Sequence, residues 1–246
     1  MPMPASGEFK LSISQALTDQ LQARLKLLTP ELLTQENLSP LKPRQGVYQL
    51  YVGTTLVYIG SAAASLPARL RQHLRKISGR QGISIEDVGF TCLYVDEDLT
   101  VLAPEDRLIA VFREAGVSPW NFNGFGNKDP GRNRDATQMP PEHFDRLYPM
   151  DLNRICEIES GSRPVAELLA ELKAGLPFLF RFERSAKALE EYQDVEVTVP
   201  EAGMSAEELL GIIAAALPDF QVTALPGYVI MYRERRLYPD ARIIGS

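Results

Sequence analysis

The chain has 246 residues, 45% of them apolar, which is enough to bury a sizeable core and excludes a disordered chain. No apolar run reaches the length of a bilayer span, and residues 1–4 lack the basic start of a secretory signal, so we expect a cytoplasmic protein without membrane contact. The net charge of −6 argues at first sight against a nucleic-acid partner, but residues 151–246 carry the whole excess, with 10 basic and 16 acidic side chains.

The first 150 residues predict a helix followed by a small, mainly antiparallel sheet flanked by helices. Leucines at 12–28 recur with the 3.6-residue period of an amphipathic helix, for which Ser14 is the candidate N-cap. Alternating segments at 47–51 and 56–59 flank Gly53-Thr54-Thr55, a hairpin turn signal. The other expected elements are a polar linker at 34–45, a helix at 66–77, a strand at 88–95, a helix at 104–112 and a long Gly-, Asn- and Pro-rich loop at 117–142.

The helix expected at 66–77 and the turn after it carry a cluster of basic residues, and no acidic residue lies between positions 61 and 85. A phosphate backbone responds to the charge within a Debye length of about 10 Å, so a local basic strip can bind DNA on an acidic chain. A solvated helix face is the alternative reading. The cluster consists of Arg69, Arg71, Arg75, Lys76 and Arg80.

Residues 151–246 predict an additional α+β region. Ser205 and Glu208 have the spacing of a capping box, which marks the start of a helix. The expected elements are a helix at 164–174, a strand at 195–199, a helix at 205–217 and a hairpin of 222–225 with 228–232 around Pro226-Gly227.

The chain has two cysteines, Cys92 and Cys156, far apart in sequence. With only two histidines, His73 and His143, to join them, the spacing does not favour a zinc site. We expect both cysteines to be reduced and structural.

Two tripeptides, Gly46-Val47-Tyr48 and Tyr58-Ile59-Gly60, lie about ten residues apart and precede the basic helix. Arg69 and His73 follow four residues apart and so share one helical face. Glu105 and then Asn121 come later in the chain. In this order and spacing the chain resembles the GIY-YIG nuclease superfamily, whose active site consists of two tyrosines, an arginine, a glutamate and often an asparagine. The span from Glu105 to Asn121 is a few residues longer than in the usual motif.

The stretch from Trp120 to Arg132, together with 144–149 and 11–14, resembles a subgroup of type II restriction endonucleases that cut a GC-rich palindromic site. The resemblance implies an α+β fold with a GIY-YIG nuclease core at 46–150, an N-terminal helix and linker at 1–45, and a C-terminal α+β extension at 151–246. It also implies double-stranded DNA as substrate. A homodimer would match a palindrome, and a separate methyltransferase would protect the host DNA.

Phosphodiester hydrolysis needs a water nucleophile, a proton acceptor, a cation on the scissile phosphate and a proton for the leaving oxygen. Glu105 is the candidate ligand for Mg²⁺, which Mn²⁺ could replace. Arg69 would stabilise the phosphate charge, and Tyr48 would orient the water or accept its proton with help from His73. Tyr58 would hold the water or the phosphate with its hydroxyl, and Asn121 would orient Glu105, the metal-bound water or the local backbone. Each residue also has an ordinary structural alternative. These are strand aromatics for Tyr48 and Tyr58, surface helix residues for Arg69 and His73, a first-turn acid for Glu105, and a loop amide for Asn121.

Sequence recognition requires side chains that reach base edges, for which arginine and lysine with guanine are the commonest pairs. The glycine-rich loop after the site supplies such side chains, and loop polarity due only to exposure is the alternative reading. The predicted DNA contacts are Arg71, Arg75 and Lys76 to phosphates, with Asn123, Asn127, Lys128, Arg132 and Arg134 in the loop.

Three functions remain open at this point. A magnesium-dependent type II restriction endonuclease is the first, and a structure-specific repair or mobile-element GIY-YIG endonuclease is the second. A DNA-binding module without turnover is the third, which the complete set of Tyr48, Tyr58, Arg69 and Glu105 disfavours.

Overall fold

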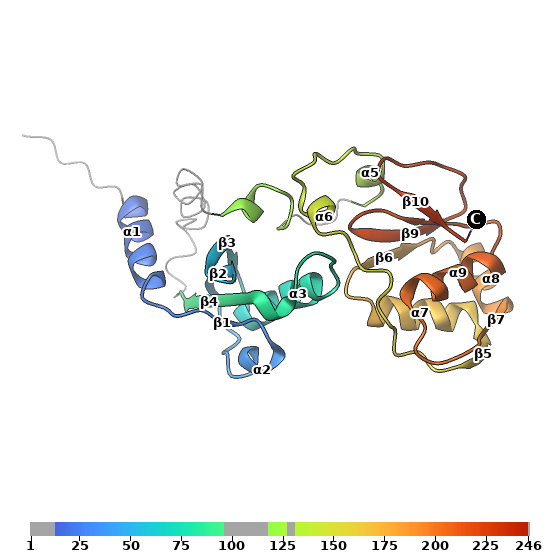
Figure 1. Cartoon of the computed structure of the whole chain (residues 1–246), viewed down its shortest axis with the longest axis horizontal. Helices are drawn as coiled ribbons and strands as arrows, with labels where there is room; N and C mark the ends of the chain where they lie inside the picture. Colours follow the sequence, from blue (N-terminus) through green and yellow to red (C-terminus); the bar gives the residue numbers. More distant parts are fainter. Residues whose placement is uncertain (1–12, 96–117, 127–130, 246) are drawn as a thin grey trace, which may run out of the picture. The chain divides into compact units, whose positions relative to one another are not determined.

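The structure is a computed structural model that describes residues 13–95, 118–126 and 131–245, and it is a mixed α+β protein (Figure 1). The described residues form two compact units: 13–71, 86–95 and 118–122 in the first, and 72–85, 123–126 and 131–245 in the second. Helix α3 (Leu66–Ser78) contributes its first turns to one unit and its last turns to the other. The sequence suggests boundaries at 45/46 and 150/151. Among the described residues, 123–126 and 131–150 group with the C-terminal residues.

The first unit contains a four-stranded antiparallel sheet with strand order β1-β4-β2-β3. The expected hairpin is present, and Gly53 in its turn has a φ of 56°, a backbone conformation that glycine adopts without strain. The strand expected at 88–95 is also present. The bounds are β1 (Glu31–Leu32), β2 (Gly46–Val52), β3 (Thr55–Ala62) and β4 (Val88–Tyr94).

Helix α1 (Ile13–Leu25) packs on one face of this sheet through Leu21 and Leu25, which contact Val47 and Ile59. The helix begins one residue before the predicted N-cap Ser14 and ends three residues before the predicted end. Shorter elements of this unit are α2 (Gln35–Leu38), which lies in the predicted linker, and the 3₁₀ turns η1 (Ile85–Asp87) and η3 (Pro119–Asn121).

The second unit contains a four-stranded sheet with order β10-β8-β9-β6, antiparallel except for the parallel pair β6 and β9. The predicted hairpin around Pro226-Gly227 is its centre. A separate antiparallel pair joins β5 to β7. The bounds are β5 (Gly161–Pro164), β6 (Leu179–Phe182), β7 (Glu196–Val199), β8 (Gln221–Ala224), β9 (Tyr228–Tyr232) and β10 (Arg242–Ile244).

The helices of the second unit include the two that the sequence predicts, α7 (Val165–Gly175) and α9 (Ala206–Ala216). The Ser205 hydroxyl accepts a hydrogen bond from the Glu208 N–H while the Glu208 carboxylate accepts from the Ser205 N–H, which completes the predicted capping box. Helix α8 (Ala186–Asp194) was not predicted and begins after the N-cap Ser185. The predicted loop at 117–142 contains one further short helix, α5 (Arg132–Asp135), and α6 (Phe144–Leu147) follows it.

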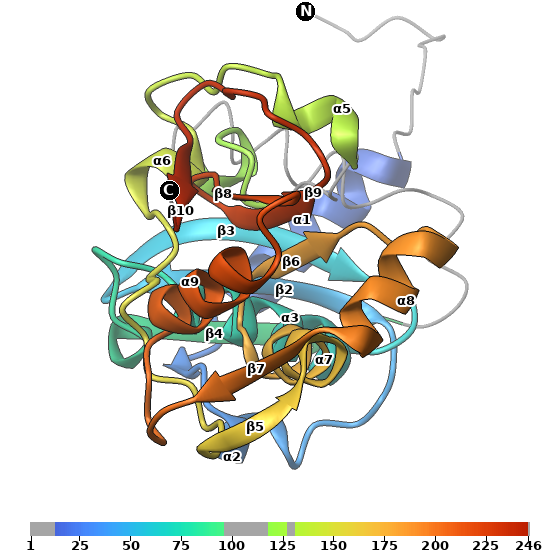
Figure 2. The ribbon, with the colours of Figure 1, turned by 90° about the vertical axis from the view of Figure 1, so that its right-hand side faces the viewer.

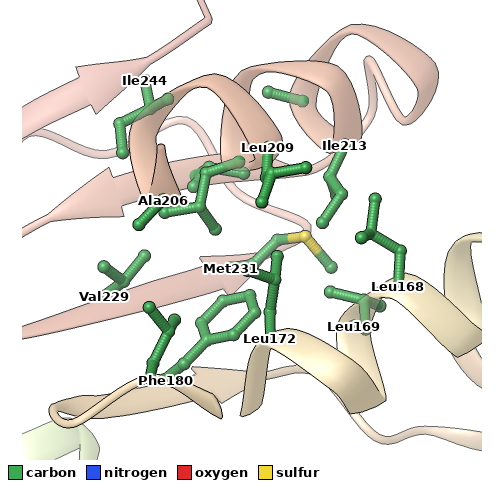
Figure 3. Close-up of a cluster of buried hydrophobic side chains, with 14 of the residues drawn as sticks. Leu168, Leu169, Leu172, Phe180, Ala206, Leu209, Ile213, Val229, Met231 and Ile244 are labelled. Carbon is green, nitrogen blue, oxygen red and sulfur yellow. The ribbon is translucent and has the colours of Figure 1, made fainter. Parts of the chain in front are cut away.

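The core of the second unit lies between its sheet and helices α7 and α9. Figure 3 shows leucines of these helices pointing toward side chains of β6 and β9. Alternate residues of β9 point to the opposite face, where Tyr228 and Ile230 pack with Met139 and Tyr238. In Figure 2, α9 and α5 lie on opposite sides of this sheet. The residues shown from the two helices and the sheet are Leu168, Leu169, Leu172, Leu209, Ile213, Phe180, Val229 and Met231.

In the part of the chain that the structure describes, no helix combines the length and the apolar character that crossing a membrane requires.

Candidate active site

The two glycine–tyrosine tripeptides pair with each other across the β2–β3 hairpin. Tyr48 lies opposite Gly60, and Tyr58 lies opposite Leu50. Because cross-strand partners and residues two apart in a strand share a face of the sheet, Tyr48, Tyr58 and Gly60 all lie on one face. The two tyrosine rings are 6.1 Å apart between centroids and are both buried.

Both glycines of the tripeptides are sites of close approach. A Cβ built on Gly60 would lie 2.4 Å from the Tyr48 hydroxyl oxygen, so the Tyr48 ring crosses the space above Gly60 that a larger residue would fill. A Cβ built on Gly46 would lie 2.1 Å from the backbone oxygen of Leu93 on β4. Each glycine thus has a packing reason: Gly60 gives the Tyr48 ring room on the hairpin, and Gly46 allows close approach to the β4 backbone.

Arg69 of α3 brings a cation to this group. Its Nε donates a hydrogen bond of 3.3 Å to the Tyr48 hydroxyl oxygen, and it also interacts with Tyr58. Burial alone would lower the pKa of the half-buried guanidinium, but both tyrosines act in the opposite sense, and the Arg69 pKa is raised. Arg69 is therefore a fixed positive charge, and it is the most exposed member of the group.

Asn121 of η3 lies against the same hairpin and contacts its backbone. Its Oδ1 accepts a hydrogen bond of 2.9 Å from the N–H of Ile59, and its Nδ2 donates one of 2.7 Å to the Ile59 carbonyl. The amide thereby fixes the residue next to Tyr58. Of the roles expected for Asn121, the structure shows the one on the local backbone.

His73 belongs to the second unit, where its side chain is buried and stacks on Phe125 with ring centroids 4.9 Å apart. The proton-accepting role expected for His73 stays a prediction.

The basic cluster of α3 divides into side chains with and without protein partners. Arg71 forms no hydrogen bond or ion pair with any described residue, so its guanidinium is available to a phosphate. Arg75 instead donates to the carbonyls of Ala174 and Leu176 at the end of α7. Lys76 donates to the Phe125 carbonyl at 2.7 Å.

Arg80 is buried and lies 3.0 Å from the buried carboxylate of Asp145. The second ion partner of Asp145 is Arg134, whose guanidinium also lies 5.2 Å from the Tyr228 ring centroid. Burial acts to raise the Asp145 pKa, but Arg80, Lys76 and Arg134 outweigh burial, and the pKa is lowered. Asp145 is thus an ionised buried group that joins α3, α5 and α6.

The loop residues predicted to read bases have different environments. Asn123 is buried, and its Oδ1 accepts a hydrogen bond from the N–H of Phe125, which gives it a role in a turn. Arg134 is committed to Asp145. Arg132 keeps 58% of its side chain exposed, although it pairs with Glu234. Asn127 and Lys128 lie outside the described residues.

Glu105, the predicted metal ligand, also lies outside the described residues. Among those that the structure describes, no group of three or more histidine, cysteine or acidic side chains could hold a metal ion. A single carboxylate is nevertheless compatible with Mg²⁺, which usually keeps several of its water ligands. The cysteines are free, as expected, and burial raises the Cys92 pKa to about 11 and also raises that of Cys156, so both thiols are protonated near neutral pH.

Asp145 and Gln221 have structural roles that the sequence did not indicate. Gln221 is a buried amide of β8 that fixes the loop before β10. The only sequence signal for Asp145 was its place in a motif-like stretch at 144–149. No family model matches the chain, and no curated protein matches it.

Proposed function

We propose that this protein is a metal-dependent endonuclease of the GIY-YIG type that hydrolyses phosphodiester bonds of duplex DNA, and specifically a type II restriction endonuclease. The observation that carries the proposal is the group of Tyr48, Tyr58 and Arg69 on one face of a hairpin that Gly60 keeps open. Two buried hydroxyls that share one guanidinium are an arrangement suited to an anionic oxygen, because the cation stabilises negative charge that develops beside it.

Each residue has a task in this proposal. Arg69 binds the scissile phosphate and stabilises the charge of the transition state. Tyr48 orients the attacking water and, as the phenolate, accepts its proton, with the Arg69 guanidinium stabilising the phenolate charge. Tyr58 holds a phosphate or water oxygen with its hydroxyl. Asn121 acts through the Ile59 backbone and so positions Tyr58.

Glu105 would hold Mg²⁺, which supplies Lewis-acid stabilisation of the phosphate oxygen. The available Arg71, at the start of the basic strip, would contact a backbone phosphate of the bound DNA. A palindromic site would be cut by a homodimer in which each protomer presents one such site.

The test is digestion of unmethylated plasmid DNA with the purified protein, with Mg²⁺ or with a chelator. We expect discrete fragments with Mg²⁺ and intact plasmid with the chelator. The Glu105→Gln variant should not cleave but should bind DNA within a few-fold of wild type, because the change removes a metal ligand with little change of shape. Glu36→Gln, an exposed first-turn acid of α2, is the matched control and should cleave normally. Full cleavage by Glu105→Gln would refute the metal-ligand assignment.

A structure-specific repair or mobile-element endonuclease is distinguished by the substrate. Preference for branched or damaged DNA over an intact palindromic duplex would favour that class and refute the restriction assignment. Binding of DNA without metal-dependent cleavage would refute both nuclease classes.

A further inference from the structure

The segment between β9 and β10 is rich in arginine and is held rigidly in the second unit. Gln221 of β8 fixes the backbone of Arg236 on both sides: its Oε1 accepts from the Arg236 N–H at 3.0 Å, and its Nε2 donates to the Arg236 carbonyl at 2.6 Å. Tyr238 is buried, and its hydroxyl donates to Glu234 at 2.6 Å. A surface segment with these internal bonds presents its outward side chains in a fixed geometry.

The outward side chains of this segment are a cation and an apolar residue. Arg236 is exposed, its guanidinium lies 4.9 Å from the Tyr238 ring centroid, and it forms no ion pair with a described carboxylate. Leu237 is 84% exposed, more than any other large apolar side chain in the described part of the chain. An exposed leucine alone needs no explanation. An exposed arginine on a hydrogen-bonded backbone, next to an exposed leucine, is a more specific feature.

Side-chain contacts connect this segment to the loop residue Arg132. Arg132 binds one oxygen of Glu234 at 2.6 Å and lies 4.2 Å from the Tyr232 ring centroid. The other oxygen of Glu234 accepts from Tyr238, which supports Arg236. A continuous line of contacts therefore runs Arg132–Glu234–Tyr238–Arg236, with two guanidinium groups braced by aromatic rings and one acid between them. We call this set, with Leu237, the β9–β10 surface.

We propose that the β9–β10 surface is a second DNA-contact surface, in which Arg236 and Arg132 bind phosphates or base edges of a duplex and Leu237 makes an apolar contact in a groove. The inference rests on the proposed function, since it takes duplex DNA as the ligand. Planar guanidinium groups held by rings keep their orientation and match phosphate and guanine geometry. Apolar side chains contact thymine methyl groups or enter base steps.

Charge balance also favours this surface over the rest of the acidic C-terminal region. Arg233 pairs with Glu191 and Asp219, and Arg242 pairs with Glu207. Neither Arg235 nor Arg236 pairs with any described carboxylate. Arg235 donates instead to the backbone oxygens of Pro218 and Glu234. The segment therefore has an excess of positive charge where its neighbours are neutralised.

The test measures binding of the full-length variants to a duplex that contains the cleaved site and to a scrambled duplex, in Ca²⁺ across a salt series. Arg236→Gln should bind several-fold more weakly, and the slope of log K against log[salt] should fall by about one unit. Arg242→Gln removes the same charge from the same unit, outside the surface, and should bind as wild type. Circular dichroism of both variants checks that the fold is retained.

Two more variants give results of different sign and kind. Glu234→Gln should strengthen binding, because it releases Arg132 from a carboxylate and removes a negative charge, while the amide oxygen can still accept from Tyr238. Leu237→Ala should weaken binding at an unchanged salt slope, because an apolar contact releases no counterions.

Equal affinities for Arg236→Gln and Arg242→Gln would overturn the inference, as would weaker binding by Glu234→Gln. If the wild type cuts DNA but Arg236→Gln binds normally, the surface assignment fails and the proposed function stands. If the wild type binds DNA without Mg²⁺-dependent cleavage and Arg236→Gln is weaker, the proposed function fails and the surface assignment stands.

Discussion

Helix α3 carries basic residues along its whole length, and its two ends use them differently. In the first unit, Arg69 faces two tyrosine hydroxyls, and Arg71 has no partner among the described residues. In the second unit, Arg75 and Lys76 donate to backbone carbonyls, and Arg80, two residues after the end of α3, is buried against Asp145. Basic residues of one segment therefore contact the tyrosine pair at one end and form packing contacts at the other. What separates the two roles is the neighbour that each guanidinium meets, not its place in a run of positive charge.

Asp145→Asn tests the buried contact with Arg80 in the second unit, and it should have the largest effect on stability. Arg80 would stay buried without a countercharge, so we expect the free energy of unfolding to fall by about 3–5 kcal/mol. Urea denaturation followed by circular dichroism measures the loss. Asp240→Asn is the matched control, because Asp240 forms a partly exposed pair with Arg146 at 3.5 Å. Pairs of that kind contribute about 0–1 kcal/mol. Similar losses in both variants would contradict the structural role of Asp145.

Tyr48→Phe tests the contact between Arg69 and the tyrosine pair in the first unit. Removing the hydroxyl that Arg69 contacts should lower the cleavage rate by about 10²–10⁴-fold if Tyr48 accepts the proton of the water. Tyr51→Phe, in the same strand, removes a hydroxyl that donates to Gln49 and should keep the wild-type rate. Rates are measured with excess enzyme on a labelled duplex. A Tyr48→Phe enzyme as fast as Tyr51→Phe would show that the hydroxyl has no part in the chemistry.

Gly60→Ala tests the room above the hairpin. The new methyl group would meet the Tyr48 hydroxyl oxygen at 2.4 Å, so the ring must move, and overpacking of this kind costs about 1–3 kcal/mol. We expect lower stability together with slower cleavage. Gly211→Ala is the opposite case: nothing lies within 4 Å of its Cβ in helix α9, and alanine there should stabilise the protein by about 1 kcal/mol. Thermal unfolding separates the two, and a stabilising Gly60→Ala would contradict the close packing.

The smallest expected effect is on the pH dependence of stability. Burial, and then Arg134, Lys76 and Arg80, lower the His143 pKa below 6.5 against the opposing effect of Asp145. The unfolded chain then binds the proton more tightly, so stability is complete above about pH 6.5 and falls as pH drops through the folded-state pKa. Asp145, with its pKa below 3.8, adds to this loss only in stronger acid.

His143→Asn should reduce the loss of stability between pH 7 and 5, because asparagine can also accept from the Asp145 N–H at the start of α6 without titrating. Urea denaturation of both proteins at the two pH values measures it. If both proteins lose the same stability between pH 7 and 5, His143 is not the cause of that loss.

The elements that the sequence predicted well are those whose signals are local. The β2–β3 hairpin has its turn glycine, and α9 has its capping box within four residues. The two-residue strand β1 and the parallel strand β6 were missed because tertiary pairing, not local pattern, defines them. The roles of the α3 side chains could not be predicted for the same reason, because their partners are distant in sequence. Lys76 donates to a carbonyl 49 residues away, and Arg75 donates to one 101 residues away.

The Tyr48, Tyr58 and Arg69 group was predicted as a set because the order and spacing of the two tripeptides and the later arginine resemble a known motif. The close approach at the glycines is visible only in the structure. Three roles were expected for Asn121: orienting Glu105, the metal-bound water or the local backbone. The structure shows its contact with the Ile59 backbone.

The contact between Asn121 and Ile59 has a consequence for assembly. Strand β3 is the outer strand of its sheet, and an outer strand offers unpaired N–H and C=O groups to which another chain can add. The Asn121 amide occupies both of these groups on Ile59, as one residue of a neighbouring strand would. A second copy of the chain therefore cannot pair with Ile59 to extend the sheet while this contact is in place.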